Sequence, residues 1–200
     1  MAINQTVRKS YHHGDLESAL ITTAIKLIKK NGPANLSLRE VAAEVGVSPS
    51  AAYHYFPDKD SLIGAIGSVL FADLARMEEE AVLAISGNSA LAAKRRLRAI
   101  GRAYFQWAKK QPHLFQLIFG GFCNMNQSGD HESDPAFQLL SKTLDDLVET
   151  KAIPKEFRKG GEVLAWSCVQ GATNLIIEGH LPEEAFEIVL DGLENGLSIR

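Results

Sequence analysis

Residues 37–62, SLREVAAEVGVSPSAAYHYFPDKDSL, contain two short helical patterns on either side of a turn. Ser37 and Glu40 form an S-x-x-E pattern, which predicts a capping box in which each side chain binds the other residue's backbone N–H. Apolar residues then recur at helical spacing, and Gly46 supplies the left-handed residue that often ends a helix. We therefore expect one helix to begin after Ser37 and to end before Gly46.

A second, shorter helix follows this turn. Ser48 is placed to cap it, and Pro49 fits the first helical position, where the missing N–H of proline costs nothing. Pro57 ends the pattern. Two helices joined by about three or four residues that include a glycine form the arrangement of a helix-turn-helix unit.

The short helix needs support from its neighbours, because a helix of about seven residues is not stable by propensity alone. We expect Val47, Phe56 and either Ala51 or Ala52 to hold it in place. The polar groups that remain on its outer side are Ser48, Ser50, Tyr53, His54 and Tyr55. Hydroxyl groups and rings of this kind suit phosphate oxygens and base edges. Alternatively, the two tyrosines pack at the seam between the first and fourth helices.

The rest of the chain also favours helices, because no stretch shows sustained period-two alternation. The sequence predicts an all-α fold. A first helix is expected from a cap at Asp15 to Lys30, and a long one from a cap at Asp58 to Leu83. Further helices are expected near residues 89–110, 112–120, 135–151, 156–179 and 182–197, with the least ordered loop at 127–130.

Composition limits the class of protein. The chain has 200 residues, of which 46% are hydrophobic and 22% charged, as is typical of globular proteins. No apolar run approaches the roughly 18 residues of a spanning helix, and the N-terminus lacks the apolar stretch of a leader, so we expect a cytoplasmic protein without a membrane partner. Cys123 and Cys168 lack CxxC spacing, which favours buried reduced thiols over a disulfide or a zinc site.

Charge is distributed unevenly along the chain. Residues 1–59 hold seven Lys and Arg against five Asp and Glu, so their net charge is +2. Because the whole chain has a net charge of −3, residues 60–200 carry −5. A mildly basic head on an acidic body is compatible with DNA binding by the head. The sequence contains no HExxH, GxSxG or GxxxxGK motif, so we expect neither enzyme activity nor a metal or cofactor.

Residues 36–66, LSLREVAAEVGVSPSAAYHYFPDKDSLIGAI, resemble the DNA-binding motif of the TetR family of bacterial transcriptional regulators. Residues 11–32, YHHGDLESALITTAIKLIKKNG, resemble the first helix of that family. The resemblance implies a three-helix DNA-binding head over residues 1–59 and a helical effector-binding and dimerisation body over residues 60–200. The positions that it assigns to DNA contact are Ser37, Arg39, Ser48, Pro49, Ser50, Ala51, Tyr53, His54 and Lys59.

These positions differ in their expected roles. The resemblance assigns phosphate contacts to Tyr53 and Lys59, and it lets Arg39 reach a base, since arginine bound to guanine is the commonest specific contact. Alternatively, Arg39 is a solvated partner of an acidic neighbour. Ala51 and Ala52 replace larger residues of the family, which favours readout of DNA shape. Residues 1–12 are either an arm along the DNA backbone or a disordered leader.

The resemblance also implies a homodimer that binds a palindromic operator as a repressor, because a two-fold protein matches a two-fold site. Apolar stripes near residues 156–179 and 182–197 are candidates for the dimer interface, unless both face the core of their own chain. A small, largely apolar effector would release the repressor. The alternative is a DNA-binding or interaction protein without such a switch. Candidate effector contacts are Tyr104, Trp107, Phe115, Phe119, Phe122, Met125, Trp166, Gln170 and Asn174.

Overall fold

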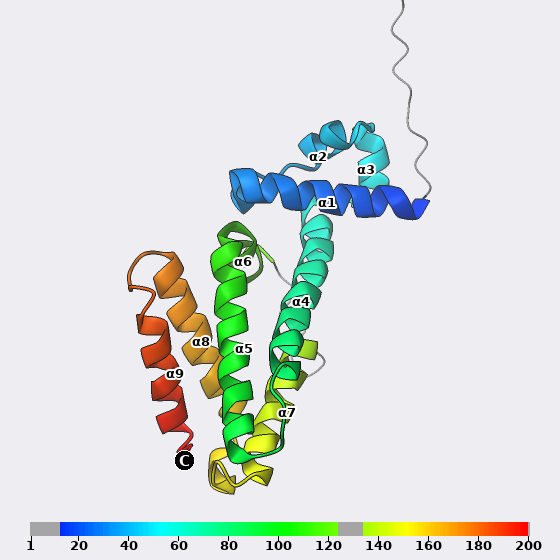
Figure 1. Cartoon of the computed structure of the whole chain (residues 1–200). Helices are drawn as coiled ribbons and strands as arrows, with labels where there is room; N and C mark the ends of the chain where they lie inside the picture. Colours follow the sequence, from blue (N-terminus) through cyan, green and yellow to red (C-terminus); the bar gives the residue numbers. More distant parts are fainter. Residues whose placement is uncertain (1–12, 124–133, 200) are drawn as a thin grey trace, which may run out of the picture. The chain divides into compact units, whose positions relative to one another are not determined.

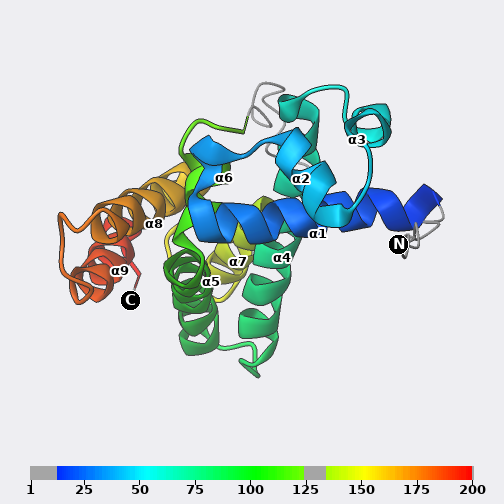
Figure 2. The same cartoon turned by 90° about the horizontal axis from the view of Figure 1, so that it is seen from above.

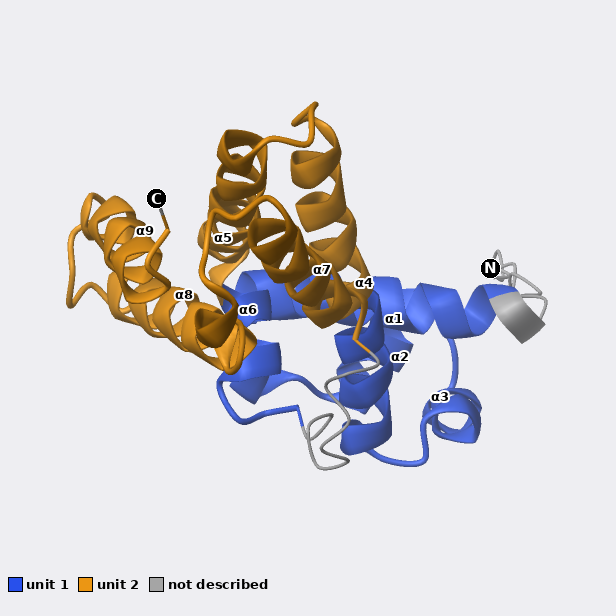
Figure 3. Cartoon of the chain, turned by 90° about the horizontal axis from the view of Figure 1, so that it is seen from below, with its two compact units in different colours: residues 1–69, 113–125 blue, residues 70–112, 126–200 orange. Residues whose placement is uncertain are grey.

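The computed structural model describes residues 13–123 and 134–199 (Figure 1). Within these ranges the chain forms α-helices and short 3₁₀ turns and no β-strand, which confirms the all-α prediction. The described residues divide into two compact units (Figure 3). Unit 1 lies within residues 1–69 and 113–125, and unit 2 within residues 70–112 and 126–200. None of the described helices combines the length and apolar character that crossing a membrane requires.

Unit 1 is built around the first helix. Its elements are α1 (His13–Asn31), η1 (Pro33–Asn35), α2 (Leu38–Val45), α3 (Pro49–Tyr55), the first part of α4 (Lys59–Leu83) and α6 (Pro112–Phe119). Helix α2 packs against both α1 and α3 (Figure 2). The side chains of Leu20 and Ile28 on α1 and of Val41 on α2 have no exposed surface. The apolar stripes seen in the sequence therefore form the core of this unit.

The ends of α1 were only partly predicted. The helix begins at His13, so Asp15 lies in its first turn and is not its cap, which corrects the prediction. A carboxylate in the first turn still interacts favourably with the positive end of the helix dipole. The predicted stop is confirmed, because Gly32 has a φ of 78° and its N–H donates to the Ile28 carbonyl at 2.8 Å.

The start of α4 follows the prediction. Asp58 Oδ1 accepts the backbone N–H of Ser61 at 2.7 Å, and Ser61 Oγ lies 3.3 Å from the backbone nitrogen of Asp58. The hydrogen bonds from Ser61 lower the pKa of Asp58. This reciprocal pair satisfies two N–H groups at the helix start and fixes the first residue of α4.

Unit 2 is centred on a long helix, α5. Its elements are the remainder of α4, α5 (Ala90–Lys110), α7 (Pro135–Glu149), η4 (Lys155–Phe157), α8 (Gly161–Ile177) and α9 (Ala185–Gly196). Helix α5 packs against α7 and α8, and α8 packs against α9 (Figure 1). At one end of the unit, Leu144, Leu147 and Leu197 are fully enclosed.

Two predicted helix starts in unit 2 were wrong. Helix α8 begins at Gly161 and not near residue 156, because residues 155–157 form a 3₁₀ turn and Gly160 has a φ of 79°. Helix α9 begins at Ala185 and not at residue 182. Cys123 is buried as predicted, whereas Cys168 is only half-buried. The loop predicted at residues 127–130 lies outside the described residues.

Ion pairs join α9 to α5 along their length. Arg98 and Arg102 bind Glu187 at 2.6 and 2.7 Å, and Lys109 pairs with Glu183, which lies just before α9. Hydrogen bonds from Arg102 lower the pKa of Glu187 to about 2. Burial acts in the opposite direction, and hydrogen bonds from Arg98 add to the lowering. Because the pairs are partly exposed, each contributes little to stability, but together they fix the register of α9 along α5.

We predict that Gly101 on α5 cannot carry a side chain without cost. A Cβ atom there would lie 3.0 Å from Leu190 Cδ2 of α9 and 3.4 Å from Val169 Cγ2 of α8. Gly101→Val should therefore lower the free energy of unfolding by about 1–3 kcal/mol in urea denaturation. Gly64→Val on α4 is the control, because nothing lies within 4 Å of its Cβ position. Equal effects of the two substitutions would contradict the close approach at Gly101.

Candidate nucleic-acid interface

The turn between α2 and α3 fixes the relation of the two helices. Gly46 adopts the left-handed conformation, with φ 84° and ψ 29°. The N–H groups of Gly46 and Val47 both donate to the carbonyl of Ala42, at 3.0 and 2.9 Å. The predicted end of α2 is therefore confirmed.

The start of α2 differs from the prediction in one detail. Ser37 is the N-cap residue and has an extended backbone, as expected, but its side chain makes no capping hydrogen bond. The serine half of the predicted capping box is therefore absent. Ser37 is exposed, so water can bind the first-turn N–H groups in place of the serine oxygen.

Helix α3 is held at its start and at its end. Ser48 Oγ accepts the N–H of Ala51 at 3.2 Å, and Pro49 occupies the first helical position, which confirms both predictions. Ala52 is 0% and Phe56 4% exposed, so these two residues anchor the helix to unit 1. Of the two alanines considered, Ala52 is therefore the buried one.

The residues predicted to face DNA are mostly exposed. Ser37 and Arg39 on the α2 side and Ser48 to Ser50 at the start of α3 lie on the surface, as do Tyr53 and His54. Ala51 is half-buried. Tyr53 keeps 40% of its surface exposed. Within the described part of the chain Arg39 forms no ion pair, so the acidic partner considered for it is not present there.

Two predicted side chains have partners inside unit 1. Lys59 is half-buried, and its Nζ donates to the carbonyl of Ala34 at 3.3 Å. This bond joins the start of α4 to the turn after α1, a contact that sequence reasoning missed. Tyr55 is half-buried, with its ring edge-on to that of His54 at a centroid distance of 5.7 Å.

Three of the residues predicted to bind an effector meet in unit 2. The hydroxyl of Tyr104 on α5 donates to Gln170 Oε1 on α8, and it also hydrogen bonds to Trp166 on the same helix. Burial raises the pKa of Tyr104 well above its usual value. We call Tyr104, Trp166 and Gln170 the α5–α8 polar cluster.

The other predicted effector residues are placed differently. Trp107 is fully enclosed, and its Nε1 donates to Asp73 Oδ2 at 2.9 Å. Phe115 and Phe119 belong to unit 1, where their ring centroids lie 5.1 Å apart. Phe122, also in unit 1, and Asn174, on α8, are half-buried, and Met125 lies outside the described residues.

Sequence reasoning missed Glu78. This α4 residue is 3% exposed, and its Oε2 has no hydrogen-bond partner within the described part of the chain. Burial, assisted by the negative charge of Asp134, raises the pKa of Glu78 to about 8. Leu70, Leu74 and Glu78 lie four residues apart, on one face of α4. The apolar stripe therefore indicated that position 78 is buried.

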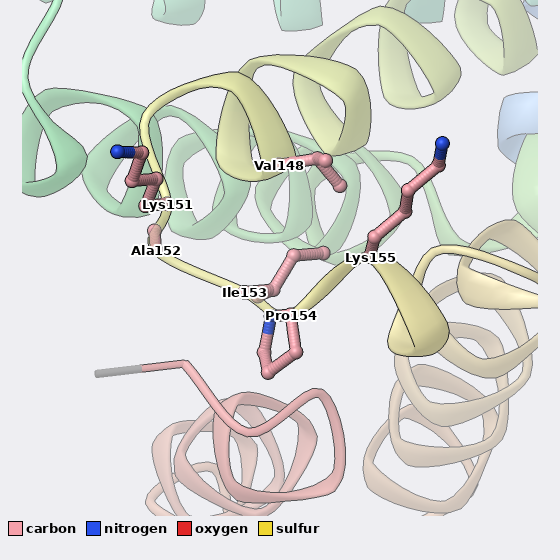
Figure 4. A pocket seen from close by; sticks show the side chains of 6 residues that line it. All are labelled: Val148, Lys151, Ala152, Ile153, Pro154 and Lys155. Atoms are coloured by element: carbon pink, nitrogen blue, oxygen red, sulfur yellow. The ribbon is translucent and has the colours of Figure 1, made fainter.

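Two surface pockets lie elsewhere in unit 2. One, of about 310 Å³, is lined by residues 148 and 151–155, and Figure 4 shows the apolar side chains of Val148 and Ile153 between those of two lysines. Another, of about 480 Å³, lies between α4 and α5 and includes Arg95, Arg98 and Arg102. Neither pocket is lined by a residue that the sequence assigned to the effector.

Family models match two parts of the chain. A family model described as bacterial regulatory proteins of the tetR family matches residues 20–66, and one described as a tetracyclin-repressor-like C-terminal domain matches residues 97–193. The chain belongs to the TetR family. It is therefore a transcriptional regulator with a DNA-binding helix-turn-helix, and this family is not one of enzymes.

Curated relatives match less than half of this TetR-family chain. The HTH-type transcriptional regulator BetI of Brucella canis is 42% identical over 57 residues, which is 28% of this chain and 29% of BetI. BetI of Agrobacterium fabrum is 33% identical over 88 residues, or 44% of this chain and 40% of the relative. The matches thus span less than half of these relatives' length.

Solved structures match the TetR-family chain over nearly its whole length. A protein of unknown function from a Rhodococcus species has a TM-score of 0.77 and 25% identity, and the match covers 95% of this chain and 99% of the other. The TetR family regulator PfmR of Thermus thermophilus has a TM-score of 0.62 and 18% identity, with 96% and 98% covered. The second likeness supports the fold alone.

We predict that the turn at Gly46 is sensitive to the side chain placed there. Gly46→Ala should destabilise the protein by about 1–2 kcal/mol, because a Cβ is disfavoured at positive φ. Gly46→Asn should cost less, since asparagine adopts this conformation more readily. Urea denaturation of both variants measures the difference, and a wild-type stability for Gly46→Ala would contradict the left-handed turn.

Proposed function

We propose that this regulator binds a palindromic operator as a homodimer, represses transcription there and is released by a small-molecule effector. Residues 1–59 would read DNA, and residues 60–200 would bind the effector and the second subunit. The observation that carries the DNA-binding part is the exposed outer side of α3, whose capped start and buried anchors hold it in one position.

The chemistry of this surface suits the DNA backbone. Ser48, Ser50 and Tyr53 offer hydroxyl groups that can donate to phosphate oxygens, which take half or more of protein–DNA hydrogen bonds. The small Ser50 and Ala51 would let the start of α3 approach the major groove closely. Arg39 is the long donor of the set, and it would contact a base edge from α2.

We predict that Tyr53→Phe weakens operator binding about 2–10-fold, because one hydrogen bond to a phosphate is lost. Phosphate contacts carry no sequence information, so the loss should be the same for every operator variant. The measurement is a binding titration on an operator selected from random DNA and on a set of its single-base variants. An unchanged affinity would show that the Tyr53 hydroxyl makes no DNA contact.

Arg39→Ala is the contrasting variant in the same titration. It should relax the preference at one base pair in each half-site and alter the others little. A uniform loss across all operator variants would limit Arg39 to the backbone. If the wild-type protein selects no palindromic sequence at all, the proposed operator binding is wrong.

Exposed apolar side chains on the last two helices support the homodimer. Val163 on α8 is 67% exposed and Ile188 on α9 is 70% exposed, and Leu175 on α8 is 42% exposed. Exposed apolar groups that gather on neighbouring helices often mark an interface. Helices α8 and α9 of two subunits would then form a four-helix interface that sets two α3 helices one DNA turn, about 34–36 Å, apart.

We predict that Ile188→Glu weakens the dimer at least about 10-fold, because it places a charge in an apolar interface. Leu83→Glu is the control, since Leu83 on α4 is 73% exposed and lies outside the proposed interface. Sedimentation equilibrium of both variants gives the dissociation constants. Equal dimer stability for the two variants would exclude α9 as a subunit contact.

The effector part of the proposal depends on α4. This continuous helix belongs to unit 1 up to residue 69 and to unit 2 from residue 70. An effector held near the α5–α8 polar cluster would change the tilt of α4 and so alter the spacing of the two α3 helices. A coupling free energy of about 1–3 kcal/mol is enough for a 5–150-fold loss of operator affinity.

A further inference from the structure

The carboxyl group of Glu78 is in an unfavourable position. It is 3% exposed, and Oε2 receives no hydrogen bond from any described residue. A buried polar group without a partner destabilises a fold, and a buried charge without one does so more strongly. Because its pKa is about 8, the group is largely uncharged at neutral pH in the absence of a ligand. A bound group that supplied the missing partner would remove this cost.

The ion pairs among the described residues of unit 2 do not include Glu78. Arg98 and Arg102 pair with Glu187, and Arg158 pairs with Asp145 and Glu162. The charged group that acts on Glu78 is another carboxylate, that of Asp134 at the start of α7. Among the described residues, the other buried carboxylate, Glu194, pairs with Lys94 and Arg98, whereas Glu78 has no cation partner.

The α5–α8 polar cluster approaches Glu78 through Tyr104. Tyr104 lies close enough for the charge of Glu78 to raise its pKa. The hydroxyl of Tyr104 already donates its proton to Gln170, so it is not available as a donor to Glu78. The rings of Tyr104 and Trp166 can instead lie against the apolar part of a ligand or against a cation.

A metal ion is a poor candidate for the missing partner. Among the described residues, no group of three or more His, Cys, Asp or Glu side chains is placed to hold one. An organic cation needs fewer ligands, because one carboxylate and an aromatic face are sufficient for an ammonium group.

We propose that Glu78 anchors the effector and that the effector is an apolar organic amine, whose ammonium group pairs with this carboxylate while its hydrocarbon part lies against Tyr104 and Trp166. This inference rests on the proposed effector response. Glu78 ionises as the amine binds, so its carboxyl proton passes to the solvent and the ammonium keeps its own protons. Binding of the amine at pH 7 therefore releases close to one proton.

The test uses matched probes that differ only in charge. Phenylbutylamine, naphthylmethylamine and decylamine are each compared with the alcohol of the same skeleton by titration calorimetry, in buffers of different ionisation enthalpy. We expect at least one amine to bind the wild-type protein 10-fold or more tightly than its alcohol, with release of a proton. In Glu78→Gln the preference should disappear. Glu79→Gln, which changes an exposed neighbour on α4, should retain it.

A second variant tests the site without any ligand. Glu78→Met replaces the unpartnered carboxyl by an apolar group of similar volume, so it should raise the melting temperature of the apo protein by about 2–4 °C. A lower melting temperature would show that Glu78 has a structural partner, and this would overturn the inference. So would amines that bind no better than their alcohols, or a preference that persists in Glu78→Gln.

Operator binding by the same preparations separates the two proposals. If the wild-type protein binds its operator but shows no preference for amines, the role of Glu78 is wrong and the regulator function stands. If it binds no operator, the proposed function is wrong, whatever the probes do. An amine that binds through Glu78 and lowers operator affinity supports both.

Discussion

The left-handed backbone at Gly46 is the constraint on which the position of the exposed outer side of α3 depends. It turns the chain within a few residues, and the N–H groups of Gly46 and Val47 share one carbonyl acceptor. Helix α3 has only 7 residues and would not form alone, so its direction is set by this turn, by its cap at Ser48 and by the burial of Phe56. Because the turn, the cap and the buried Phe56 all fix the same orientation of α3, its polar side chains lie together on one exposed side.

The elements near this turn were predictable, since their determinants lie within a few residues of each other along the chain. Gly46, Ser48 and Asp58 act as the sequence indicated, and α4 has the predicted bounds. The wrong predictions concern helix starts at which another interaction can replace the predicted cap. The capping bond of Ser37 competes with water at an exposed helix start, and the first turn of α1 can place Asp15 inside the helix at little cost.

The polar site in the body could be predicted only in part. Tyr104 and Gln170 were recognised as candidates, but the hydrogen bond between them joins residues 66 positions apart, and no local pattern indicates it. Glu78 stands among three consecutive glutamates, of which only one is buried. Which one depends on the register of α4 against its neighbours, and tertiary packing decides that register.

The placement of the two tryptophans has an optical consequence. Both indoles of the chain, Trp107 and Trp166, belong to unit 2, and unit 1 holds none. Trp107 is enclosed and bound to Asp73, so its emission should stay constant, whereas the half-buried Trp166 is bonded to Tyr104. Intrinsic fluorescence of the native protein therefore reports events in unit 2 through Trp166, and no tryptophan lies on the surface proposed to bind DNA.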